Sequence, residues 1–156
     1  MKRVLVTGMS GTGKSTLLGE LADRGYWTVD TDYPDAAGDF HETVDGERLW
    51  VESRIDALLS VEDPRTVLIV AGTTRNQVEF YPRFDHVVLL SAPADVLRQR
   101  LRTRTNNPYG STPSDVAEIL SNLAAVEPLL RHTATLEVVT TIPVEEVADA
   151  VLAHVR

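Results

Sequence analysis

Residues 8–15 read Gly8-Met9-Ser10-Gly11-Thr12-Gly13-Lys14-Ser15, and this stretch decides the fold. It fits the pattern G-x-x-x-x-G-K-[ST] at every position. An apolar run over residues 2–7 precedes it and predicts a buried strand, and leucines at helical spacing follow it. A strand, a glycine-rich loop and a helix in this order predict a phosphate-binding loop, because the loop N–H groups and the helix N-terminus favour anions.

This loop predicts a site for a nucleoside triphosphate. The ammonium group of Lys14 is expected to reach the β- and γ-phosphates, and the Ser15 hydroxyl to ligate Mg2+. Residues Gly8 to Ser15 and the following Thr16 form the expected ATP-binding segment. A glycine turn that precedes a lysine by coincidence is the alternative, which the flanking strand and helix disfavour.

The composition predicts one globular domain with a single core. The chain has 156 residues, of which 43% are apolar and 24% charged, and it contains no cysteine for disulfides or thiolate metal sites. It shows no apolar run of membrane-spanning length and no recognisable signal peptide, so we expect a cytoplasmic protein with no membrane partner. The net charge of −8 disfavours nucleic acid as a partner. We expect a monomer or a weak homodimer.

Predicted strands and helices alternate along the rest of the chain. Strands are expected over residues 26–30, 66–71, 86–91 and 136–139, and helices over residues 94–104, 113–131 and 144–155. Residues 33–64 begin as an irregular segment and then become helical, with Leu49, Ile55, Leu58 and Leu59 as the buried stripe. This alternation predicts an α/β fold with a parallel sheet covered by helices on both faces, and ligands at the carboxyl ends of its strands.

Two acids follow the second predicted strand. Asp30 and Asp32 lie two residues apart, so an extended strand would point both carboxylates the same way at the ligand edge. Phosphoryl transfer needs oxygen ligands for Mg2+ and a group that orients the acceptor hydroxyl, and these two acids could serve both needs. Ordinary turn chemistry is the alternative. Ala71, at the end of the third strand, cannot supply the metal-holding Asp of many nucleotide hydrolases, which favours the two acids.

Arginines at two places are candidates for anion binding. On the predicted helix 94–104, Arg100 and Arg104 lie nearest the apolar stripe and are expected at the site, whereas Arg98 and Arg102 are expected to be solvated. The following loop, 106–111, suits a segment that closes over a ligand.

The segment after the third strand also lies at the ligand edge. Arg75 is expected to bind an acceptor anion or the transferring phosphoryl group, and Gly72 to allow close approach. A helix start capped by Thr or Asn is an equally compatible alternative.

Together these features resemble the small P-loop kinases of the adenylate kinase, shikimate kinase and gluconate kinase superfamily. The phosphate loop, Asp30-x-Asp32, Gly72-x-x-Arg75, Arg100-Leu-x-x-Arg104 and Thr141-Ile142-Pro143 occur in that family's order. The resemblance implies a single P-loop NTPase domain over residues 1–156, with a five-stranded parallel sheet in the order 2-3-1-4-5. It also implies an acceptor-binding helical region at about residues 33–62 and a short lid at about residues 104–113.

The same resemblance implies roles for individual residues. Arg100 would lie against the adenine, Arg104 on the phosphates, and Ile142 and Pro143 at the adenine edge. Asp30 would lie near Mg2+ and Asp32 on the acceptor. Ala71 departs from the Asp that is typical of adenylate kinase.

The balance of charge between residues 30 and 56 bears on the acceptor. This segment holds nine acids but only two arginines, Arg48 and Arg54. A nucleoside monophosphate needs clustered guanidinium groups, so the count favours a neutral or cationic hydroxyl compound. Trp50 could stack on the acceptor, although a lone Trp is more often part of the core.

The sequence therefore predicts an ATP-dependent kinase that uses Mg2+ and acts on a small-molecule phosphoryl acceptor, with a hydroxyl-bearing metabolite favoured. The expected catalytic residues are Lys14, Asp32 and Arg104, and the expected acceptor-binding residues are Asp32, Arg54, Gly72 and Arg75. Two alternatives stay open at this point. One is a nucleoside monophosphate kinase, and the other is a slow ATPase or nucleotide-dependent switch without an acceptor.

Overall fold

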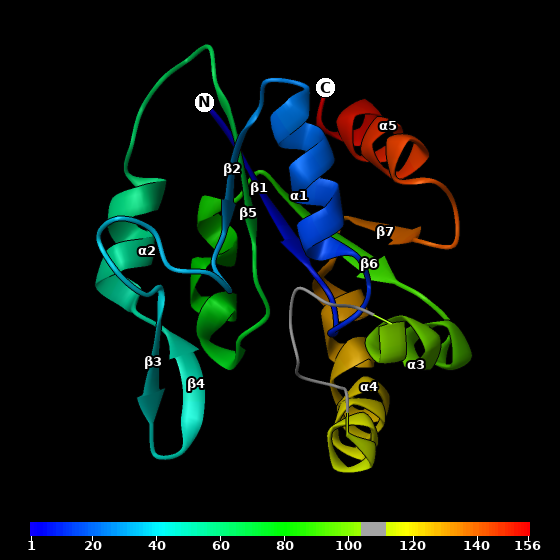
Figure 1. The fold of residues 1–156 in the computed structure, drawn as a ribbon. Helices are drawn as coiled ribbons and strands as arrows, with labels where there is room; N and C mark the ends of the chain where they lie inside the picture. The colour runs from blue at the N-terminus through cyan, green and yellow to red at the C-terminus, as the bar shows by residue number, and fades with distance from the viewer. Residues whose placement is uncertain (104–111) are drawn as a thin grey trace.

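Five parallel strands form the central sheet of the protein (Figure 1). The structure is a computed structural model that describes residues 1–103 and 112–156. The strands of the sheet are β1 (Lys2–Thr7), β2 (Trp27–Asp30), β5 (Val67–Ala71), β6 (His86–Ser91) and β7 (Leu136–Val139). Their order is β2-β5-β1-β6-β7. When only these five strands are numbered along the chain, their order in the sheet is 2-3-1-4-5. The predicted α/β class is confirmed.

Helices cover both faces of the sheet. In the described part of the chain they are α1 (Lys14–Asp23), α2 (Glu52–Leu59), the 3-10 helix η1 (Arg75–Arg83), α3 (Ala94–Thr103), α4 (Pro113–Thr133) and α5 (Val144–Val155). None of these helices is both long and apolar enough to cross a membrane. The helix start that was the alternative interpretation of the segment after the third strand is confirmed, because Thr74 caps η1 in a capping box with Gln77.

The core has two main parts because successive side chains of a strand point to opposite faces. Val4 and Val6 of β1 pack with α1 and α5 on one face. Leu5, between them, packs on the other face with Trp50 and with side chains of α2 and η1. Figure 1 shows α1 and α5 side by side, with α2 on the far side of β2.

A β-hairpin occupies residues 41–50, which the sequence pattern placed in an irregular segment and the start of a helix. The hairpin consists of β3 (His41–Val44) and β4 (Glu47–Trp50), which pair antiparallel. Leu49 therefore lies in a strand, while Ile55 and Leu59 are buried on α2 as predicted. The region predicted as helical is thus a hairpin followed by a helix of 8 residues.

A local signal for this hairpin was present. Asp45 and Gly46 form its turn with positive φ angles of 52° and 78°. Asp-Gly is a favoured pair for a two-residue turn in which both residues are left-handed, so the alternating sequence on either side belongs to paired strands.

Candidate nucleotide site

The phosphate loop joins the end of β1 to the start of α1, and its backbone requires glycine. Gly8 has a φ of 149°, and a Cβ placed there would lie 2.4 Å from the Leu90 carbonyl oxygen. Gly13 caps α1 with a φ of 101°, and nothing lies within 4 Å of its ideal Cβ position. The first backbone N–H groups of a helix have no carbonyl partner within it. The loop therefore presents N–H donors and the positive end of the α1 dipole to the same space.

Lys14 is buried at the base of this loop. Its Nζ donates to the carbonyl oxygen of Gly8 at 2.6 Å and to that of Met9 at 3.3 Å. Both carbonyls also accept from threonine hydroxyls, Gly8 from Thr73 at 2.6 Å and Met9 from Thr12 at 2.7 Å. The ammonium group can therefore move toward a phosphate without leaving either carbonyl oxygen unsatisfied.

Ser15 and Asp30 form a pair beside the loop. The Ser15 hydroxyl donates to Asp30 Oδ2 at 2.6 Å, and the backbone N–H of Asp32 donates to Asp30 Oδ1 at 3.1 Å. Burial raises the pKa of Asp30 above its ordinary value, although both hydrogen bonds oppose this shift. A hydroxyl and a partly desolvated carboxylate are the hard oxygen donors that Mg2+ prefers, so these residues fit the ion. Among the described residues there is no group of three or more acids and histidines that could hold a metal by itself.

Asp32 lies on a different side of the site from Asp30. Its Oδ1 is 3.9 Å from Arg48 Nη1 and 4.0 Å from His41 Nε2, and both partners belong to the β3–β4 hairpin. Burial and the nearby Arg48 charge lower the pKa of His41 and so favour its neutral form. The Asp32 carboxylate thus faces the hairpin, with Arg48 at ion-pair distance.

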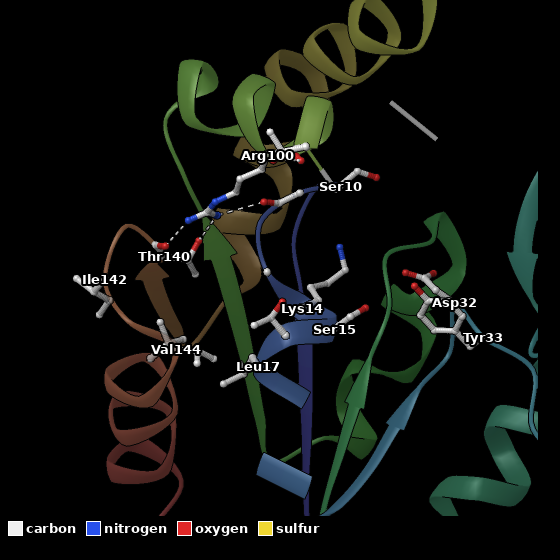
Figure 2. Close-up of a pocket in the computed structure, with 15 residues that line it drawn as sticks. Ser10, Lys14, Ser15, Leu17, Asp32, Tyr33, Arg100, Thr140, Ile142 and Val144 are labelled. Atoms are coloured by element: carbon white, nitrogen blue, oxygen red, sulfur yellow. Dashed lines mark hydrogen bonds between the residues drawn. The ribbon is translucent and has the colours of Figure 1, made fainter. Parts of the chain in front are cut away.

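A cavity of about 440 Å3 runs along the phosphate loop. Figure 2 shows Lys14 and Ser15 between two ends, with Arg100 and Thr140 at one end and Asp32 and Tyr33 at the other. Its lining consists of Ser10, Gly11, Gly13, Lys14, Ser15, Thr16, Leu17, Asp32, Tyr33, Arg100, Thr103, Thr140, Ile142, Val144 and Val147. One continuous space therefore connects the phosphate loop with the acid proposed for the acceptor.

Most residues predicted for the nucleotide lie in this lining. Arg100 donates to the Gly11 carbonyl oxygen at 3.1 Å and to Thr140 Oγ1 at 2.8 Å, and burial lowers its pKa. Gly8, Met9 and Thr12 are buried within the loop behind the lining, and Pro143 caps α5 next to Ile142. Arg98 and Arg102 are exposed, as expected. Arg104, together with the predicted lid up to residue 111, lies outside the described residues.

Of the residues predicted for the acceptor, only Asp32 lines this cavity. Arg54 lines a second cavity of about 1000 Å3 beside β2, and Arg75 extends into solvent. Gly72 permits a close approach, but the group that approaches it is the protein's own Trp50 ring. A Cβ on residue 72 would lie 2.8 Å from that ring. Trp50 is fully buried, which confirms its place in the core.

The sequence did not predict a chain of hydrogen bonds that supports the phosphate loop. Gln77 Nε2 donates to Thr7 Oγ1 at 3.1 Å, and the Thr7 and Thr73 hydroxyls lie 3.2 Å apart. Thr73 in turn donates to the Gly8 carbonyl and accepts from the Gly8 N–H at 3.3 Å. Thr140 plays a similar part on the other side, where its hydroxyl donates to the Thr12 carbonyl at 2.7 Å. A Thr at the ligand edge of a strand is the only sequence signal for these contacts.

Comparison with known proteins places this site in a family. A family model described as AAA domain matches residues 4–121. A "Nucleotide-binding protein" of Fervidobacterium nodosum is 32% identical over 120 residues, which cover 75% of this chain and 40% of that protein. A "Nucleotide-binding protein" of Burkholderia pseudomallei is 32% identical over 125 residues, which cover 76% and 39%. The chain thus spans about two fifths of the length of these curated relatives.

Several solved structures with the same fold are small kinases. The shikimate kinase from Acinetobacter baumannii in complex with shikimate has a TM-score of 0.71 and 23% identity, over 99% of this chain and 92% of that one. A gluconokinase from Sinorhizobium meliloti has a TM-score of 0.64 and 22% identity, over 99% and 91%. Identities this low establish the fold alone. The chain belongs to the AAA domain family, and its fold is that of the small P-loop kinases.

Proposed function

We propose that this protein transfers the γ-phosphoryl group of Mg2+-bound ATP to a hydroxyl group of a small molecule. The observation that carries the proposal is the continuity of the cavity, in which the phosphate loop and Asp32 face the same space. A kinase needs a carboxylate at the far end of the phosphates, because the acceptor hydroxyl must be oriented and must lose its proton.

The charged and hydroxyl-bearing residues of the site then have defined roles in the reaction. Lys14 leaves the Gly8 carbonyl and stabilises negative charge on the β- and γ-phosphates. Asp32 orients the acceptor hydroxyl and accepts its proton, while Arg48 lies at ion-pair distance from its carboxylate. Ser15 and Asp30 would hold Mg2+, which when bound neutralises charge on the phosphate oxygens.

The apolar end of the cavity fits an adenine. Ile142, Val144 and Val147 line it together with the aliphatic part of Arg100. Because the Arg100 guanidinium is held by Gly11 and Thr140, this wall is fixed relative to the loop. We therefore assign the base to this end and the acceptor to the Asp32 end.

A coupled assay of ADP release, run over a panel of hydroxyl-bearing metabolites, tests the proposal. A kinase gives ADP release that rises with one compound, and phosphorus NMR then shows a phosphate ester in amounts equal to the ADP. Lys14→Ala is the control and should lose at least about 100-fold in turnover. If folded protein binds ATP but no compound accelerates ADP release, the proposal is wrong.

A nucleotide-dependent switch is the second candidate, and two observations favour it. β5 ends in Ala71, where no carboxylate can hold a metal or polarise water, and the curated relatives are named only as nucleotide-binding proteins. A switch predicts slow hydrolysis that no metabolite changes, so the same assay separates the two candidates.

A further inference from the structure

The arginines of residues 31–85 lie near carboxylates of the protein itself. Residues 31–85, all of which are described, contain five arginines, and each lies within ion-pair distance of an acid. The pairs are Arg48–Asp32 (3.9 Å), Arg54–Asp35 (2.8 Å), Arg65–Asp63 (3.9 Å), Arg75–Glu47 (2.8 Å) and Arg83–Asp56.

Arg54 is the most fully engaged of these arginines. Its Nη2 donates to both Asp35 oxygens at 2.8 Å, and its Nη1 donates to the carbonyls of Gly38 at 2.7 Å and Asp39 at 3.0 Å. Its guanidinium carbon also lies 4.2 Å from the centre of the Phe40 ring. A substrate anion would have to compete with these contacts for both terminal amino groups of Arg54.

Arg75, the candidate for binding an acceptor anion, is held by the hairpin. Its Nε donates to both oxygens of Glu47, at 2.8 Å and 3.0 Å. The neighbouring residue on β4, Arg48, contacts Asp32, so one strand engages both Arg75 and Asp32. The hairpin therefore pairs Arg75 with a carboxylate through Nε and places Arg48 at ion-pair distance from the acid that faces the acceptor.

The charge that remains nearby is negative. Glu79 lies near Glu52 and Arg75, and the neighbouring Glu52 carboxyl group raises the pKa of Glu79. A free anion that displaced Glu47 from Arg75 would leave a third carboxylate beside this pair. The displaced Glu47 carboxylate would repel an anionic ligand, and the ion pair between Glu47 and Arg75 would also be lost.

We infer that the acceptor is a hydroxyl compound without a carboxylate or phosphate group, either neutral or carrying an amine. This inference rests on the proposed kinase function and narrows its substrate class. A nucleoside monophosphate or a sugar acid would need a guanidinium group that is free of an acid partner, and residues 31–85 offer none. A neutral polyol needs only hydrogen bonds, and an amine gains from the surrounding carboxylates.

Compounds matched in shape and different in charge test this inference. One set is glucitol, 1-amino-1-deoxyglucitol and gluconate, and the other is inositol, an aminodeoxyinositol and quinate, each with ATP and Mg2+ in the ADP-release assay of the wider metabolite panel. We expect the best compounds to be neutral or amine-bearing, with kcat/KM at least about 10-fold above that of any carboxylate or phosphate counterpart.

Substitutions of acids give a second readout. Asp35→Asn releases Arg54 from its ion pair, and Arg54 lines the cavity beside β2 together with Ser15 and Tyr33. The kcat/KM for the carboxylate member of the best set should then rise by about fivefold while the Kd for ATP stays the same. Glu42→Gln is the control, because it removes the same charge from an exposed position on the neighbouring hairpin and should change neither value.

The outcomes are distinguishable. A carboxylate or phosphate compound as the best acceptor, or no gain in Asp35→Asn, overturns the inference and leaves the kinase function intact. Binding of ATP without acceleration by any compound of the panel overturns the kinase function, and the inference with it.

Discussion

Asp30 and Asp32 carry the same side chain two residues apart, yet they meet different surroundings. Asp30 is held by Ser15 beside the phosphate loop, whereas Asp32 faces the cavity between Arg48 and His41. Asp32→Asn should therefore lower acceptor-dependent kcat by about 100-fold or more with little change in the Kd for ATP, because a general base is lost. Asp30→Asn should instead raise the Mg2+ concentration for half-maximal activity by about 10-fold or more.

Steady-state kinetics over a Mg2+ titration, with ATP binding measured by calorimetry, separates these two effects. Identical behaviour of the two variants would show that the carboxylates act as one group, and a loss of ATP binding in Asp32→Asn would place that residue on the nucleotide.

The ionised form of Asp30 also destabilises the folded protein, which follows from its raised pKa. The folded protein favours the protonated form of a buried acid, so the destabilisation is complete above the folded-state pKa and disappears below the unfolded value of about 3.8. Without ligands, Asp30→Asn should melt about 1–3 °C above the wild type at pH 7, and the difference should shrink as the pH falls through the folded-state pKa. Melting curves from pH 7 to pH 4 measure this, with the exposed Glu42→Gln as the charge control. A difference that grows toward acid pH would contradict the assignment.

At the scale of elements, Thr73 connects the end of β5 to the phosphate loop. Its hydroxyl both donates to and accepts from the backbone of Gly8, and Thr7 and Gln77 continue the chain of hydrogen bonds. Thr73→Val keeps the shape but removes these bonds, so the Kd for ATP should rise by about five- to tenfold, the size expected for one hydrogen bond. Thr73→Ser retains the hydroxyl and should restore binding. Equal affinities in all three proteins would mean that the strand alone holds the loop.

The elements themselves show what the sequence could and could not predict. The five strands of the sheet, and helices α1, α3, α4 and α5, follow from local periodicity, and the phosphate loop from its motif. The hairpin was missed because Leu49 was assigned to the buried stripe of the helix that Ile55 and Leu59 do form, and the Asp45-Gly46 turn was overlooked. The contacts of Thr73 and Thr140 join residues that are distant in the chain, so no local pattern reports them.

The acceptor side was the least predictable part for the same reason. Arg54 and Arg75 have the residue type and the approximate place of ligand-binding arginines. Only the folded structure shows that Asp35 and Glu47 already occupy them.

In the whole molecule, the nucleotide site brings together segments that are distant in the sequence. The cavity is lined by the phosphate loop, α1, the turn after β2, α3 and the segment from Thr140 to Val147. A ligand that contacts all of them binds the folded chain and not the unfolded one. It must therefore stabilise the entire cooperative unit, in proportion to its affinity and concentration.

Thermal unfolding with and without nucleotide tests this coupling. A non-hydrolysable ATP analogue with Mg2+, at 100 times its Kd, should add about 2.7 kcal/mol to the free energy of unfolding. For a chain of this size that corresponds to a rise in Tm of about 5–10 °C. Lys14→Ala should melt close to the wild type without ligand, since Thr73 and Thr12 continue to donate to the Gly8 and Met9 carbonyls. At the same analogue concentration the variant should lose most of the rise, because the ammonium contact with the phosphates is gone. A variant that is unstable without ligand would show that Lys14 has a structural part, and a full rise in Tm would show that the loop binds phosphate without its lysine.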